Sequence, residues 1–181
     1  PNLTILSPMD EHELRNMMYW AVDYIDGPVV IRYPRGSGSK LEYKNEIQPL
    51  KIGSSCTLTS GSKLAILSMG QIGTEVQKTI SNNQLEGNVT HVDARFLKPL
   101  DLQKIGELFR SFDKIITVEE SCLLGGFGQQ IKVLAQDSGY QGTITSLGLP
   151  DVFVEHGEIS ELRAKYDIDA EGIGKVISTL L

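Results

Sequence analysis

Apolar side chains recur along the first part of the chain at helical spacing and then form a short continuous run. The helical positions between residues 7 and 25 are Leu14, Met17, Met18, Ala21, Val22 and Ile25. Ser7 is the expected N-cap of this helix, with Pro8 in its first turn and Asp10 three residues after the cap, as in a capping box. Residues 29–33 then predict a short strand, apolar enough to be covered on both faces.

From residue 63 onward, short apolar runs alternate with helical patterns. Strands are expected at 64–69, 89–93, 114–118 and 142–147, and helices at 72–80, after Asp101, after the turn 125–128, and at 171–180. This alternation predicts βαβ units with right-handed crossovers. The expected fold class is therefore α/β, a three-layer αβα domain with a mostly parallel sheet.

Between these two parts, residues 37–62 are polar and rich in Gly, Ser and Lys, with only weak strand signals around Cys56. This composition is typical of an interdomain connector. We therefore expect three parts: residues 1–40, a connector at 41–62, and the αβ domain at 63–181.

Composition excludes several classes of function. The 181 residues include 17 basic and 23 acidic side chains, a net charge of −6, and no cluster of Lys and Arg that could follow a phosphate backbone. No apolar run approaches the ~18–20 residues that span a bilayer. The two cysteines and three histidines show no metal-ligand spacing, so neither nucleic acid, membrane nor metal is an expected partner of these residues.

Ligands of open α/β sheets bind beyond the carboxyl ends of strands. Arg35 follows the first predicted strand at that end, after the rigid Pro34, and its guanidinium suits a phosphate or carboxylate. The alternative for Arg35 is an interdomain ion pair or a solvated cation. Arg32 lies inside the apolar run and is expected to pair internally with a carboxylate.

Glu119 and Glu120 end the third strand of the αβ domain, before a turn that contains Gly125 and Gly126. Paired carboxylates suit acid–base chemistry, and a glycine turn lets a helix N-terminus approach an anion. The turn lacks the G-x-G-x-x-G pattern and a phosphate-loop lysine, which favours the alternative of tight packing with capping carboxylates.

A third group of polar residues follows the second strand of the αβ domain. Asp93 and Arg95, two residues apart at this strand end, are expected to form a structural brace. Asp101 is expected to cap the next helix.

The motifs resemble those of transketolase-like thiamine diphosphate enzymes. The end of their pyrimidine-binding domain is similar to SPxDE at 7–11, DGP at 26–28 and RYPRG at 32–36. Their C-terminal domain resembles DxRFxKPLD at 93–101, TVEE at 117–120 and GGFG at 125–128. Within these enzymes, GLPDxFxEHG at 148–157 and DAEGI at 169–173 resemble the 1-deoxy-D-xylulose-5-phosphate synthase family.

The resemblance implies that residues 1–40 end a pyrimidine-binding domain and that residues 63–181 form a transketolase C-terminal domain. It also implies a transferase that joins pyruvate to D-glyceraldehyde 3-phosphate, releasing CO2, in isoprenoid, thiamine and pyridoxal precursor synthesis. The cofactors would be thiamine diphosphate and Mg²⁺, bound mainly by residues absent from this chain. The protein would be a homodimer in the bacterial cytoplasm or the plastid stroma.

The family's activating Glu and catalytic His would lie upstream of Pro1, so we expect no catalytic residue here and no activity from this C-terminal portion alone. Arg35 matches the family position that contacts the acceptor phosphate, and Arg32 is a weaker candidate. Glu119, Glu120, Gly125 and Gly126 are candidates for an interface near the active-site mouth. The alternative is a non-catalytic dimerisation or interdomain module of a transketolase or 2-oxo-acid dehydrogenase β-type enzyme. A third alternative is a stand-alone dinucleotide-binding domain, but the sequence lacks the glycine fingerprint of such domains.

Overall fold

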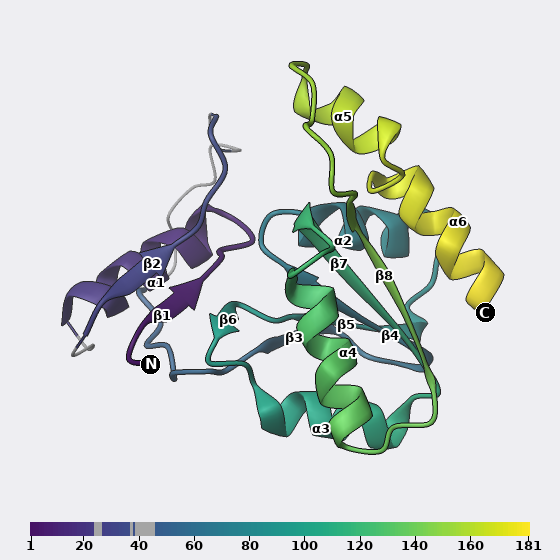
Figure 1. Cartoon of the computed structure of the whole chain (residues 1–181), viewed down its shortest axis with the longest axis horizontal. Helices are drawn as coiled ribbons and strands as arrows, with labels where there is room; N and C mark the ends of the chain where they lie inside the picture. Colours follow the sequence, from purple (N-terminus) through teal and green to yellow (C-terminus); the bar gives the residue numbers. More distant parts are fainter. Residues whose placement is uncertain (24–26, 37, 39–45) are drawn as a thin grey trace.

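Two β-sheets organise the chain in a computed structural model, which describes residues 1–23, 27–36, 38 and 46–181 (Figure 1). The larger sheet has the order β3-β5-β4-β7-β8 and the smaller one the order β2-β1-β6. The strands are β1 (Thr4–Leu6), β2 (Val29–Ile31), β3 (Cys56–Thr59), β4 (Gly61–Met69), β5 (Gly87–Asp93), β6 (Phe96–Lys98), β7 (Lys114–Cys122) and β8 (Thr143–Leu149). The helices are α1 (Glu11–Asp23), α2 (Gly73–Asn82), α3 (Leu102–Ser111), α4 (Phe127–Asp137), α5 (Ile159–Lys165) and α6 (Ala170–Leu180).

The larger sheet confirms the predicted three-layer αβα fold. Its strands β5, β4, β7 and β8 are parallel, and only the edge strand β3 is antiparallel. Side chains of β4 alternate between two cores: Leu64 and Ile66 pack with α2 and α6, whereas Ala65 and Leu67 pack with α3 and α4. Because both faces are covered, the strand is apolar throughout its buried part.

The smaller sheet joins the N-terminal stretch to the αβ domain. Strand β1 pairs in parallel with β2 and in antiparallel with β6, which follows β5 in the αβ domain. Phe96 of β6 is fully buried and meets Trp20 of α1 edge to face, with 5.7 Å between ring centroids. Leu6, Met17 and Leu50 complete this core. The sheet and its core therefore hold the end of β2 against the αβ domain.

The first helix begins later than expected, and Ser7 is not its N-cap. The backbone N–H of Glu13 donates to Asp10 Oδ1 at 2.9 Å, so Asp10 caps α1. The Ser7 hydroxyl instead donates to the carbonyl of Arg32 at 3.0 Å and so links β1 to the end of β2. The expected cap at Asp101 is confirmed, since its carboxylate accepts the N–H of Lys104 at 3.0 Å.

Part of the expected connector belongs to the larger sheet. Residues Cys56–Thr59 form β3, paired with β5, and β4 begins at Gly61. Residues 37 and 39–45 of that segment lie outside the described residues. The division into parts at residues 40 and 62 stays a prediction. Strands β1 and β6 and helix α5 were not predicted, because each is too short to show a period.

Truncating Phe96 tests the joint between the two sheets. Phe96→Ala removes a fully buried ring from the smaller core, so the free energy of unfolding should fall by about 3–5 kcal/mol. Phe153→Ala is the matched control, because Phe153 is fully exposed and its loss should change stability by less than about 0.5 kcal/mol. Urea unfolding of both variants measures the difference, and equal stabilities would show that Phe96 does not hold the joint.

Candidate functional site at the junction of the two sheets

The ends of β2, β4 and β7 come together where the N-terminal stretch meets the αβ domain. Gly70, directly after β4, approaches Ser7 so closely that an added Cβ would lie 2.4 Å from the Ser7 hydroxyl oxygen. Gly70 also has a φ of 82°, which favours glycine. This close approach brings the candidate residues of β2 and β7 to one junction.

Glu119 of β7 caps helix α4. It is fully buried, and its carboxylate accepts the backbone N–H of Phe127 and that of Gly128, each at 2.8 Å. The Ser121 hydroxyl donates to the same carboxylate. A negative charge at the N-terminus of a helix is favourable, because it meets unpaired N–H groups and the positive end of the helix dipole. The capping alternative weighed for Glu119 is therefore the one observed.

Gly126 makes this cap possible. An added Cβ at Gly126 would lie 2.4 Å from Glu119 Oε2 and 2.3 Å from the carbonyl oxygen of Cys122. Gly125 has a φ of 76°, so it supplies the turn before the helix. A place for Glu119, Glu120, Gly125 and Gly126 at an interface or active-site mouth stays a prediction.

Glu120 points away from α4 and contacts two arginines. Its carboxylate Oε1 lies 2.8 Å from Nε and 2.6 Å from Nη2 of Arg163 in α5. Its backbone carbonyl accepts a hydrogen bond from Arg32 Nη2 at 2.9 Å. Arg32 was expected to pair with a carboxylate, and no such pair is found among the described residues. Since β2 ends at Ile31, the side chain of Arg32 is exposed and reaches the carbonyl at the end of β7.

Arg35 lies four residues beyond the last residue of β2 (35 − 31 = 4) and is exposed. Within the part of the chain that the structure describes, Arg35 makes no hydrogen bond or ion pair. The interdomain ion pair considered for Arg35 is therefore not found among the described residues. Its guanidinium remains available to an anion.

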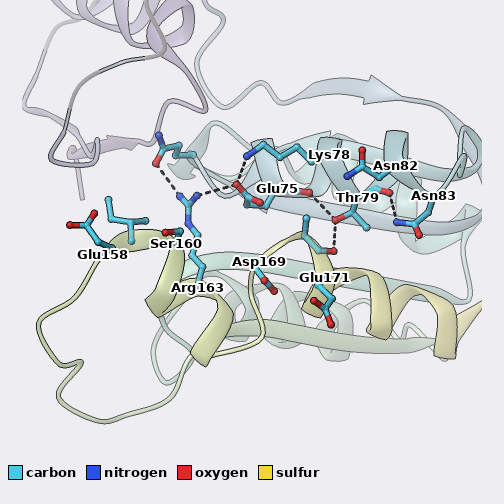
Figure 2. Close-up of a pocket in the computed structure, with 13 residues that line it drawn as sticks. Glu75, Lys78, Thr79, Asn82, Asn83, Glu158, Ser160, Arg163, Asp169 and Glu171 are labelled. Atoms are coloured by element: carbon cyan, nitrogen blue, oxygen red, sulfur yellow. Dashed lines mark hydrogen bonds and ion pairs between the residues drawn. The ribbon is translucent and has the colours of Figure 1, made fainter.

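Arg163 lies in a cleft of about 870 Å³ between α2 and the α5–α6 segment (Figure 2). Its Nη1 lies 3.3 Å from Oε1 of Glu75, and its Nη2 donates to Oε1 of Gln71 at 3.0 Å. Lys78 also pairs with Glu75, at 2.8 Å. Sequence reasoning missed Arg163 and Glu75 because α5 was not predicted and its partners lie on distant segments.

A second polar cluster is formed by His91 and Asp93 of β5 together with Arg95, which follows that strand. Asp93 and Arg95 were expected to form a brace. The guanidinium of Arg95 instead pairs with Glu13 of α1 at 2.6 Å. With a φ of 55°, Arg95 turns its backbone N–H to Asp93 Oδ1 at 3.2 Å. Burial raises the pKa of Asp93 to about 7. Burial also lowers the pKa of His91, whose Nε2 lies 2.8 Å from the Ser68 hydroxyl, to about 4.

The described side chains were also compared with the ligand sets that metal ions need. Among residues 1–23, 27–36, 38 and 46–181, no three His, Cys, Asp or Glu side chains are arranged to hold a metal ion. These residues therefore do not fit a Mg²⁺–diphosphate group by themselves. Across the same described ranges, none of the helices combines the length and the apolar character needed to cross a bilayer.

The sheet, its two helical layers and the capped helix α4 define an α/β domain of known type. The family model "Transketolase, C-terminal domain" matches residues 53–173, and the chain belongs to this family. The chain is also 44% identical over 176 residues to the 1-deoxy-D-xylulose-5-phosphate synthase of Parabacteroides distasonis, and 42% identical over 179 residues to that of Phocaeicola vulgatus. These alignments cover 97% and 98% of the chain but 28% of each relative.

A solved structure supports the same assignment. It is titled "Split gene transketolase, inactive beta4 tetramer", and it superposes with a TM-score of 0.86 at 25% identity. The match covers the whole of this chain and 58% of that one. The resemblance inferred from the motifs, and the fold class, are thus confirmed.

Neutralising Glu119 tests its capping role. Glu119→Gln replaces a charged acceptor of two backbone N–H groups in a buried site, so stability should fall by about 2–4 kcal/mol. Glu107→Gln is the control, because Glu107 is a solvent-accessible carboxylate paired with Lys104, and its loss should cost less than about 1 kcal/mol. Urea unfolding measures both variants. An unchanged Glu119→Gln protein would mean that the carboxylate does not hold α4.

The buried carboxyl of Asp93 predicts a pH dependence of stability. Its pKa is about 7 in the folded chain and 3.8 ordinarily, so the folded state binds the proton more tightly. Tighter proton binding by folded Asp93 adds to the free energy of unfolding fully below about pH 4. This contribution is lost as pH rises to 7, so the free energy of unfolding falls by at most about 4 kcal/mol. Asp93→Asn should remove this loss.

Urea unfolding at several pH values measures the effect of Asp93→Asn. The stability of the variant relative to the unmodified protein should rise between about pH 4 and pH 7 and then level off. A difference that stays constant over this range would contradict the raised pKa.

Proposed function

We propose that this chain is the C-terminal part of a thiamine diphosphate-dependent synthase. The reaction joins pyruvate to D-glyceraldehyde 3-phosphate and gives 1-deoxy-D-xylulose 5-phosphate and CO2. One observation carries the proposal: relatives with this enzyme's name match 97–100% of the chain at 38–44% identity. The chain spans 28% of the length of the first of them, so the activity belongs to a larger protein.

Arg35 is the proposed contact for the phosphate of the acceptor aldehyde. Three properties support this role: its place beyond the carboxyl end of β2, its exposure, and the lack of a partner among the described residues. A guanidinium donates two parallel hydrogen bonds to a phosphate. Arg32 is the weaker candidate, because its Nη2 is already bonded to the carbonyl of Glu120.

Thiamine diphosphate and Mg²⁺ are proposed to bind mainly outside this chain, which therefore should not be active alone. A homodimer, contact with upstream domains, a role in isoprenoid, thiamine and pyridoxal precursor synthesis, and a place in the bacterial cytoplasm or plastid stroma complete the proposal.

A second candidate function is a non-catalytic module for dimerisation or interdomain packing. The observation in its favour is the solved structure described as an "inactive beta4 tetramer", where beta4 refers to four subunits. The match to it covers all of this chain and 58% of that one. The mass of the natural protein, together with a thiamine diphosphate assay, separates the two candidates. A protein of this chain's size without synthase activity would favour the module.

Truncating Arg35 in the whole enzyme tests the proposed phosphate contact. Arg35→Ala loses a charged hydrogen bond worth about 1.5–3 kcal/mol, so kcat/KM for D-glyceraldehyde 3-phosphate should fall roughly 10- to 150-fold. The value for a non-phosphorylated aldehyde should change little. Arg110→Ala, at another exposed arginine, is the matched control and should leave both values unchanged. An equal loss with both aldehydes in Arg35→Ala would remove Arg35 from the phosphate site.

A further inference from the structure

Helix α5 is attached to the rest of the chain by an arginine. None of its residues is fully buried, but the side chain of Arg163 is only 12% exposed. Its guanidinium contacts Glu120 of β7, Gln71 just before α2, and Glu75 within α2. A planar guanidinium suits this arrangement, because its five donors are fixed in direction and its charge is permanent.

Glu120 also makes a contact between β7 and the residue that follows β2. Its carboxylate binds Arg163, while its backbone carbonyl accepts the side chain of Arg32. Arg32 is fixed on its other sides as well, since its N–H donates to the carbonyl of Leu6 at 2.8 Å and its own carbonyl accepts the Ser7 hydroxyl. Three residues further on lies Arg35.

Loss of Arg163 would leave two carboxylates without a shared cation. Glu120 would keep no other ion pair among the described residues, and Glu75 would keep only Lys78, which is 61% exposed. Glu75 and Glu120 are 11% and 25% exposed, so their mutual repulsion is only partly screened by water. The carbonyl that holds Arg32 belongs to Glu120 itself, so any displacement of the Glu120 carboxylate acts on the residue that contacts Arg32.

We propose that Arg163 is a positioning residue for the acceptor phosphate. It holds the carboxylate of Glu120, whose carbonyl binds the guanidinium of Arg32, and so it adds to the position that the smaller sheet gives Arg35, without touching the substrate. This inference rests on the proposed function, in which Arg35 contacts that phosphate.

The test uses the whole enzyme and compares two aldehydes. In Arg163→Ala, KM for D-glyceraldehyde 3-phosphate should rise roughly 5- to 20-fold while kcat changes less than about twofold. Both constants for a non-phosphorylated aldehyde should stay unchanged. Glu120→Gln should raise the same KM less, because it weakens the bond to Arg163 but leaves no carboxylate without a cation. Arg163→Lys should restore part of the loss, because it keeps the charge but not the fork of donors.

Controls separate positioning from a general loss of structure. Lys165→Ala removes another ion pair of α5, the one with Glu155, and should leave all four constants unchanged. Adding Arg163→Ala to Arg35→Ala should cause no further loss with the phosphorylated aldehyde, because both changes act through Arg35. If Arg163→Ala does not fold, Glu120→Gln and Arg163→Lys carry the same test.

Two results would overturn the inference. Arg163→Ala could affect both aldehydes equally or neither, while Arg35→Ala still discriminates between them; the positioning role would then be wrong and the phosphate contact would stand. Alternatively, Arg35→Ala itself could fail to discriminate, which would refute the phosphate contact and the positioning role together.

Discussion

The pairing of β6 with β1 is the contact on which the rest of the structure depends. It inserts a strand of the αβ domain into the sheet of the N-terminal stretch and buries Phe96 against Trp20. Backbone hydrogen bonds extend the joint, since the N–H of Ser7 donates to the carbonyl of Arg95 at 2.9 Å. Because β2 pairs with β1, the joint also fixes where β2 ends. The proposed phosphate contact at Arg35 inherits its position from this sheet.

Adjacent glutamates at the end of β7 have different roles because successive side chains of a strand point in opposite directions. Glu119 turns inward and caps α4, where glycine at position 126 leaves room for its carboxylate. Glu120 turns outward and joins α5 to β2. A pair that the sequence presented as possible acid–base chemistry thus holds three elements together around the junction.

Features with a local cause were predictable from the sequence. The apolar runs at 64–69 and 114–118 predicted two buried parallel strands, and Asp101 predicted a helix start, because each signal depends on neighbouring residues. Features set by distant contacts were not. Ser7 bonds to Arg32 rather than capping α1, and Arg95 pairs with Glu13, 82 residues away. Strand β6 has three residues and exists only because β1 lies beside it.

Amide hydrogen exchange under native conditions tests the joint most directly. The N–H of Ser7 and the N–H of Arg32 belong to the smaller sheet, and the N–H of Ala94, bonded to the carbonyl of Ser68 at 2.9 Å, belongs to the larger one. If the two sheets form one unit, these three amides open with similar free energies, within about 1 kcal/mol. Fast exchange at Ser7 and Arg32 beside strong protection at Ala94 would contradict the account, because the N-terminal stretch would then open by itself.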